Sequence, residues 1–81
     1  MKTVNQFYRV DRRRISYIKF IIEAYEGLAV VTTLDPAKGA IVLRVAPGCE
    51  ALAQDVMSDL GKTILIETME SNPQINDELS A

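Results

Sequence analysis

The sequence predicts a single two-layer α+β domain, and three observations support this. Two amphipathic runs have helical spacing and end at residues that favour helix boundaries. Between them, two apolar β-branched runs flank Asp-Pro-Ala-Lys-Gly, the pattern of a β-hairpin. A strand-like segment at either end completes the order β-α-β-β-α-β. This is the order of ferredoxin-like folds, in which right-handed crossovers place both helices on one face of an antiparallel sheet, here with strand order 4-1-3-2.

Length and composition narrow the classes of function. The 81 residues are 48% hydrophobic and 25% charged, which predicts one folded domain over residues 1–70. With no histidine and one cysteine, imidazole catalysis and cysteine-cluster metal sites are excluded, and we expect no cofactor. The formal charge of −2 makes nucleic acid an improbable general partner. Because neither a membrane span nor a secretory signal is visible, a cytoplasmic location is expected.

The first strand and helix occupy the N-terminal third. Residues Val4–Val10 alternate as a strand does. Asp11 is a favourable N-cap for a helix over Arg12–Glu26, and Gly27 suits its C-terminal end. The apolar arc of this helix consists of Ile15, Tyr17, Ile18, Ile21, Ile22 and Tyr25.

The hairpin joins strands over residues 28–34 and 40–45. Pro36 presets the backbone at the start of the turn, and Gly39 supplies the positive φ that ends it. In the second of these strands, alternate residues form a uniformly apolar set that we assign to the helix-facing side. That set is Ile41, Leu43 and Val45, which leaves Val42 and Arg44 on the open face.

The second helix and the last strand repeat the plan. The helix is expected over Cys49–Leu60, with an apolar stripe that includes Leu52, and Gly61 ends it. A strand over Ile64–Met69 follows, and the polar residues 71–81 are expected to form a disordered tail. The expected core contains Ile15, Ile18, Ile22, Ile41, Leu43, Leu52, Val56 and Ile66.

The open face of the sheet is the first candidate site. Arg9 and Glu67 are expected to pair across neighbouring strands. The apolar residues beside them are either scattered surface positions, which are normal, or an interface between copies. Because so small a domain has a small core, we expect a homodimer or higher oligomer, built on this face or on an edge strand. The interface would comprise Phe7, Arg9, Val42, Arg44, Leu65 and Glu67.

One end of the sheet is the second candidate site. Three connections meet there and carry five cations against Asp11, Asp35 and Asp59. The cations either are solvated and paired with these carboxylates, or they bind a small anionic ligand. The five are Arg12, Arg13, Arg14, Lys38 and Lys62.

An enzyme is the least supported class of function. The chain has no nucleophile–base set and no glycine-rich phosphate loop, so we assign no catalytic and no metal-binding residue. Cys49 begins a helix after Pro-Gly, where a thiol can be activated. It also shares its helix face with apolar residues, which favours a packed side chain.

Two classes of function remain open. One is an oligomerising or regulatory module that binds a small ligand or another protein, in the manner of ACT-like domains. The other is an adaptor whose basic end binds a phosphate-bearing metabolite or RNA.

Four short motifs resemble one known family. They are Tyr8-Arg-Val-Asp-Arg-Arg, Glu23-Ala-Tyr-Glu-Gly, Thr33-Leu-Asp-Pro and Ala46-Pro-Gly-Cys-Glu. Together they are similar to the bacterial family called domain of unknown function 4911, over about Tyr8 to Glu67. The resemblance implies no activity, ligand or site residue.

Overall fold

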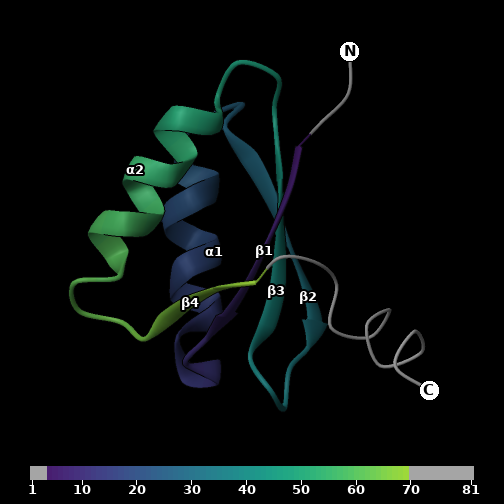
Figure 1. Ribbon diagram of the computed structural model, residues 1–81, viewed down its shortest axis with the longest axis vertical. Coiled ribbons are helices and arrows are strands. Elements are labelled where there is room, and N and C mark those ends of the chain that lie inside the picture. The colour runs from purple at the N-terminus through teal and green to yellow at the C-terminus, as the bar shows by residue number, and fades with distance from the viewer. Residues whose placement is uncertain (1–3, 70–81) are drawn as a thin grey trace.

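A computed structural model describes residues 4–69, and the tail expected at 71–81 lies outside the described residues. Four strands and two helices follow one another in the predicted order, with a short 3₁₀ turn, η1, before the first helix (Figure 1). Their bounds are β1 Val4–Val10, η1 Arg12–Arg14, α1 Ile15–Ala24, β2 Ala29–Asp35, β3 Ala40–Val45, α2 Glu50–Leu60 and β4 Ile66–Met69.

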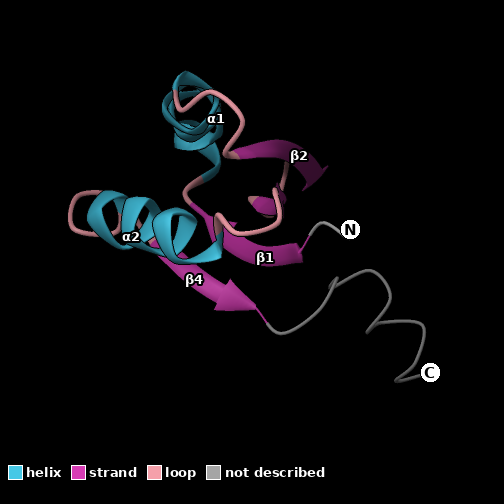
Figure 2. Cartoon of the chain, turned by 90° about the horizontal axis from the view of Figure 1, so that it is seen from above, coloured by secondary structure: helices cyan, strands magenta, loops and turns pink. Residues whose placement is uncertain are grey.

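The strands form one antiparallel sheet in the order β2-β3-β1-β4. This is the predicted order read from the other edge, so the α+β prediction and the strand order are confirmed. Both helices lie on one side of the sheet, α1 beside β2 and α2 beside β4 (Figure 2). Within residues 4–69, helices therefore cover one face of the sheet and the other is called the open face, and β2 and β4 are the edges.

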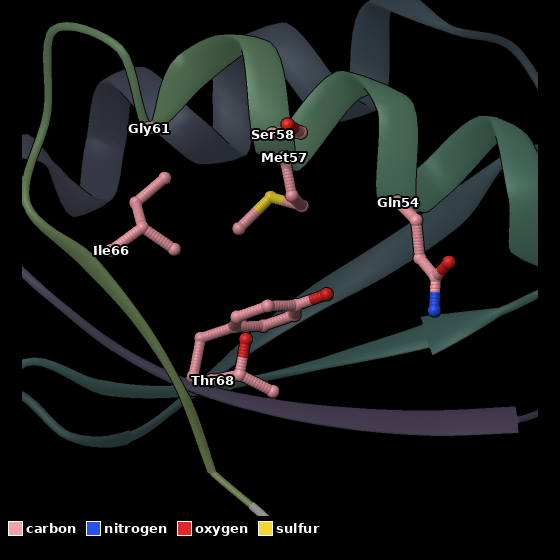
Figure 3. A pocket seen from close by; sticks show the side chains of 7 residues that line it. Gln54, Met57, Ser58, Gly61, Ile66 and Thr68 are labelled. Carbon is pink, nitrogen blue, oxygen red and sulfur yellow. The ribbon is translucent and has the colours of Figure 1, made fainter.

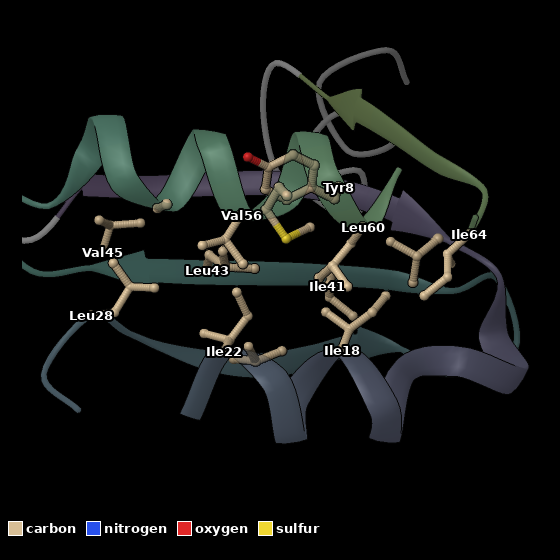
Figure 4. Close-up of a cluster of buried hydrophobic side chains, with 14 residues drawn as sticks. Tyr8, Ile18, Ile22, Leu28, Ile41, Leu43, Val45, Val56, Leu60 and Ile64 are labelled. Atoms are coloured by element: carbon tan, nitrogen blue, oxygen red, sulfur yellow. The ribbon is translucent and has the colours of Figure 1, made fainter. Parts of the chain in front are cut away.

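The core lies between the helices and the sheet (Figure 4). Its fully buried side chains come from α1 and from the helix-facing side of β3, as the alternation predicted. The predicted core residues Ile15 and Ile66 are only half-buried at its margin. The fully buried set is Ile18, Ile22, Ile41, Leu43 and Val45.

The predicted stripe of α2 was wrong at one position. Leu52 is 48% exposed, and Met57 is buried in its place. The buried residues of this helix are Ala53, Val56, Met57 and Leu60, a regular i, i+3, i+4, i+7 set. Leu52 lies on the flank of that set, so the helix is rotated relative to the sequence-based expectation.

The first helix is shorter than predicted. Asp11 is an N-cap, but of η1: its side chain accepts a hydrogen bond from the backbone N–H of Arg13, and α1 begins only at Ile15. The helix ends at Ala24, and Gly27 follows with a φ of +77°. The two tyrosines assigned to its apolar arc, Tyr17 and Tyr25, are exposed.

Candidate functional site

The ion pair predicted on the open face is present. Arg9 and Glu67 are register partners between β1 and β4, and Arg9 Nη2 lies 2.8 Å from Glu67 Oε1. Both side chains are more than half exposed, so the pair contributes at most about 1 kcal/mol to stability. It ties the short strand β4 to the sheet.

The three apolar residues of the predicted interface do not share one exposed surface. Val42 lies on the predicted face, between Phe7 of β1 and Thr32 of β2, but only 3% of it is exposed. Phe7 is half-buried. Leu65 is 62% exposed and precedes β4. The exposed apolar area on this face is therefore smaller than the sequence predicts.

Further exposed apolar surface of the same face lies at the β2 edge. Val30 is 58% exposed and is the register partner of Arg44, which is also exposed. From Ala29 to Leu34 the strand has no charged residue and no proline, and its register shifts only between Thr33 and Asp35. Natural proteins usually protect edge strands with charge, proline or bulges. The predicted strand order was the signal that β2 would be an edge.

The three connections of the basic end meet as predicted (Figure 1). The backbone N–H of Val10 donates to the carbonyl oxygen of Gly39 at 2.8 Å, and that of Asp11 donates to Leu65 at 3.1 Å. Gly39 has a φ of +74°, and a Cβ there would overlap the carbonyl oxygen of Val10. The hairpin, the start of η1 and the connection before β4 therefore form one surface.

Two of the five cations at this end are paired. Arg13 Nε lies 3.3 Å from Asp11 Oδ1, and Lys62 Nζ lies 3.4 Å from Asp59 Oδ1. Asp35 instead accepts hydrogen bonds from the backbone N–H groups of the hairpin. Among the described residues, no carboxylate lies within 4.0 Å of the charged groups of the other three, Arg12, Arg14 and Lys38.

At the start of η1 the positive charges already have an anionic partner within the chain, the Asp11 carboxylate. Hydrogen bonds from the side chain and backbone of Arg13, aided by the charges of Arg13 and Arg14, lower the pKa of Asp11. The same contact raises the pKa of Arg13. An external anion would therefore meet the side chains of Arg12, Arg14 and Lys38 rather than the helix start itself.

A pocket that sequence reasoning missed lies between α2 and β4 (Figure 3). Its volume is about 310 Å³ and it opens to solvent. No sequence motif marks it, because its residues come from three elements that only the tertiary fold brings together. The lining residues are Tyr8, Gln54, Met57, Ser58, Gly61, Ile66 and Thr68.

Cys49 lies at the N-cap of α2. Its side chain makes no capping hydrogen bond, is half-buried and packs against the core. This placement matches the prediction that the Cys49 side chain is packed.

No helix in the described part of the chain is long and apolar enough to cross a membrane.

Comparison with known proteins gives one match. The model of a family described as a domain of unknown function (DUF4911) matches residues 8–64. No curated protein and no solved structure gave a significant match. The matched span runs from the middle of β1 to the connection before β4, so it includes the basic end and most of the pocket lining.

Proposed function

The chain belongs to the family described as a domain of unknown function (DUF4911), and from its geometry we propose that it is a small non-enzymatic interaction module that forms a homodimer. The strand order and the one-sided helix layer support a ferredoxin-like arrangement. In ACT-like modules, sheets pair edge to edge or face to face, and small ligands bind at the junction.

The observation that carries the proposal is the unprotected edge of β2. An edge strand of seven residues offers backbone groups for pairing, and in β2 neither charge nor proline blocks this before Asp35. Antiparallel pairing of β2 with β2 of a second copy would join two four-stranded sheets into one. The same pairing would partly cover Val30, which is 58% exposed in one copy.

The edge is favoured over the open face predicted from the sequence. A dimer through that face would have to bury apolar area, and Val42 exposes almost none. Leu65 and Val30 distinguish the two surfaces because they are similarly exposed aliphatic residues at opposite edges of the sheet, Val30 on β2 and Leu65 directly before β4.

Light scattering coupled to gel filtration tests the proposal. At ~100 µM, where a micromolar dimer is assembled, we expect twice the monomer mass for the unaltered chain. Val30→Lys places a cation at the edge and should yield a monomer, whereas the control Leu65→Lys should remain dimeric. A monomeric unaltered chain contradicts the dimer. Dissociation by Leu65→Lys alone would place the interface on the open face.

One observation favours a second function, anion binding at the basic end. Arg12, Arg14 and Lys38 project from connections that backbone hydrogen bonds hold together, and none of the three is paired with a described carboxylate. Such a surface fits a phosphate-bearing metabolite or an RNA backbone, bound by charge alone.

Titration of pyrophosphate and a short single-stranded RNA at low salt tests this second function. Arg12→Ala/Arg14→Ala/Lys38→Ala should abolish binding, and Lys19→Ala, an exposed cation of α1, should not. For the RNA, the log–log salt dependence should be roughly 0.7 per phosphate contacted. Equal signals from the triple variant and the control would show that the cluster is only solvated.

A further inference from the structure

The pocket between α2 and β4 is built by regular geometry. Gln54 and Ser58 are four residues apart on α2 and therefore project from the same side of that helix. Ile66 and Thr68 alternate on β4 and therefore share the helix-facing side of the sheet. The close-up shows these side chains around one space, with Met57 above it (Figure 3).

The lining has an apolar floor and a polar rim. Tyr8 and Met57 are buried, and Ile66 is half-buried beside them. Gln54, Ser58 and Thr68 are exposed and carry one carboxamide and two hydroxyl groups. None of the seven lining residues is charged. An apolar body with a hydrogen-bonding edge therefore fits the lining, whereas an ion would lose hydration without gaining a countercharge.

The Tyr8 hydroxyl adds an acceptor to the pocket. It donates a hydrogen bond to Gln6 Oε1 at 2.9 Å, so its proton is already engaged and a lone pair is left for a ligand. The phenol is neutral at physiological pH, as a tyrosine ordinarily is, and burial raises the pKa of Tyr8 further. The aromatic ring and the Met57 thioether both favour an aromatic partner.

We propose that the pocket between α2 and β4 binds a neutral aromatic amide, with the ring against Tyr8 and Met57 and the amide against Gln54. The amide of the ligand and the carboxamide of Gln54 each offer a donor and an acceptor, so they pair without any charge. This site is separate from the β2 edge, since β4 is the opposite edge of the sheet.

Nicotinamide and nicotinate form a matched pair of probes, one neutral and one anionic. Each is titrated to about 10 mM, a range that reveals millimolar affinity, while the Met57 methyl and Ile66 methyl NMR signals are followed. We expect nicotinamide to shift both signals and nicotinate to bind at least about tenfold more weakly. Gln54→Ala should weaken nicotinamide binding about 3- to 10-fold, the effect of losing a neutral hydrogen bond.

The matched control is Asp55→Ala, which alters an exposed residue of α2 outside the lining and should leave the affinity unchanged. Three results would overturn the proposal: equal affinity for the two probes, no shift of the Met57 and Ile66 signals, or equal effects of Gln54→Ala and Asp55→Ala. The titration is repeated with Val30→Lys, the variant expected to be monomeric. Because Val30 lies at the edge opposite the pocket, nicotinamide should bind this variant equally well whether or not the chain forms a dimer.

Discussion

The two halves of the domain, β1-α1-β2 and β3-α2-β4, have the same order of elements: a strand, a helix, a glycine and an edge strand. The packing of the two halves nevertheless differs. In the first half α1 packs closely on β2, and Leu28 and Val31 are buried there. In the second half β4 has only four residues, and within the described residues no strand packs as closely on α2. The first half therefore closes its core and exposes a long edge, whereas the second leaves a pocket. A shared order of elements does not determine how tightly a helix covers its strand.

The glycines after the two helices show the same difference locally. Gly27 has a φ of +77°, the left-handed conformation that ends a helix sharply and turns the chain directly into β2. Gly61 has a φ of −64°, so the backbone continues in a helical conformation and reaches β4 through a longer connection. The pocket lies beside that connection, and Gly61 lines it.

The largest effect is expected at Leu43, in the central strand on which both halves depend. This side chain is fully buried, so Leu43→Ala should destabilise the domain by about 2–5 kcal/mol, most of the stability of so small a protein. Urea unfolding measures the loss. An unchanged midpoint would contradict the assignment of Leu43 to the shared core.

Two matched truncations compare the halves directly. Ile22 in α1 is fully buried, whereas Ile66 in β4 is only half-buried. We expect Ile22→Ala to cost about 2–5 kcal/mol and Ile66→Ala to cost below about 2 kcal/mol in urea unfolding. Equal losses would show that the second half is packed as tightly as the first.

The two glycines sharpen the comparison at the helix ends. Gly27→Ala forces a left-handed conformation on a residue with a Cβ and should cost roughly 1–2 kcal/mol. At Gly61 an added Cβ meets only the carbonyl oxygens of the preceding turn, at 3.3 and 3.4 Å. Gly61→Ala should therefore change the free energy of unfolding by less than about 0.5 kcal/mol. A larger loss at Gly61 than at Gly27 would reverse the distinction.

The last expected effect concerns Tyr8 and depends on pH. Because its pKa is raised in the folded state, the contribution of the neutral phenol is complete below about pH 10 and is lost as the pH rises through the folded pKa. Tyr8→Phe should remove this alkaline loss, at a cost of about 0.5–1.5 kcal/mol at neutral pH for the bond to Gln6. Urea unfolding near pH 8 and about pH 10.5 measures both, with Tyr25→Phe, which alters an exposed ring, as control. If Tyr8→Phe still loses stability at high pH, another group is responsible for that loss.

The predictions from the sequence were correct where a local pattern allows only one structural arrangement. The alternation in β3 placed Leu43 on the covered face, and the pairing of Arg9 with Glu67 followed from the predicted strand order. The prediction was wrong where more than one apolar residue of a helix could face the core. Leu52 and Met57 lie on opposite flanks of the apolar stripe of α2, and only the contact with the sheet decides which is buried.

The candidate sites also have features that the sequence predicted and features that it did not. The meeting of three connections at the basic end followed from topology, but which cations pair with carboxylates depended on side-chain positions. Arg13 and Lys62 are paired, whereas Arg12, Arg14 and Lys38 have no partner among the described carboxylates. Whether this end binds an anion, and whether copies of the chain associate, stay predictions for the experiments above.

By itself, the sequence determined the order of the elements, the face of β3 that is buried and the turns that need glycine, because each depends on spacing along the chain. The tertiary structure alone decided the burial of Val42, the rotation of α2 and the pocket beneath it. These depend on how closely separate elements approach one another. That distance is set by the packing of all their side chains together, which no single segment encodes.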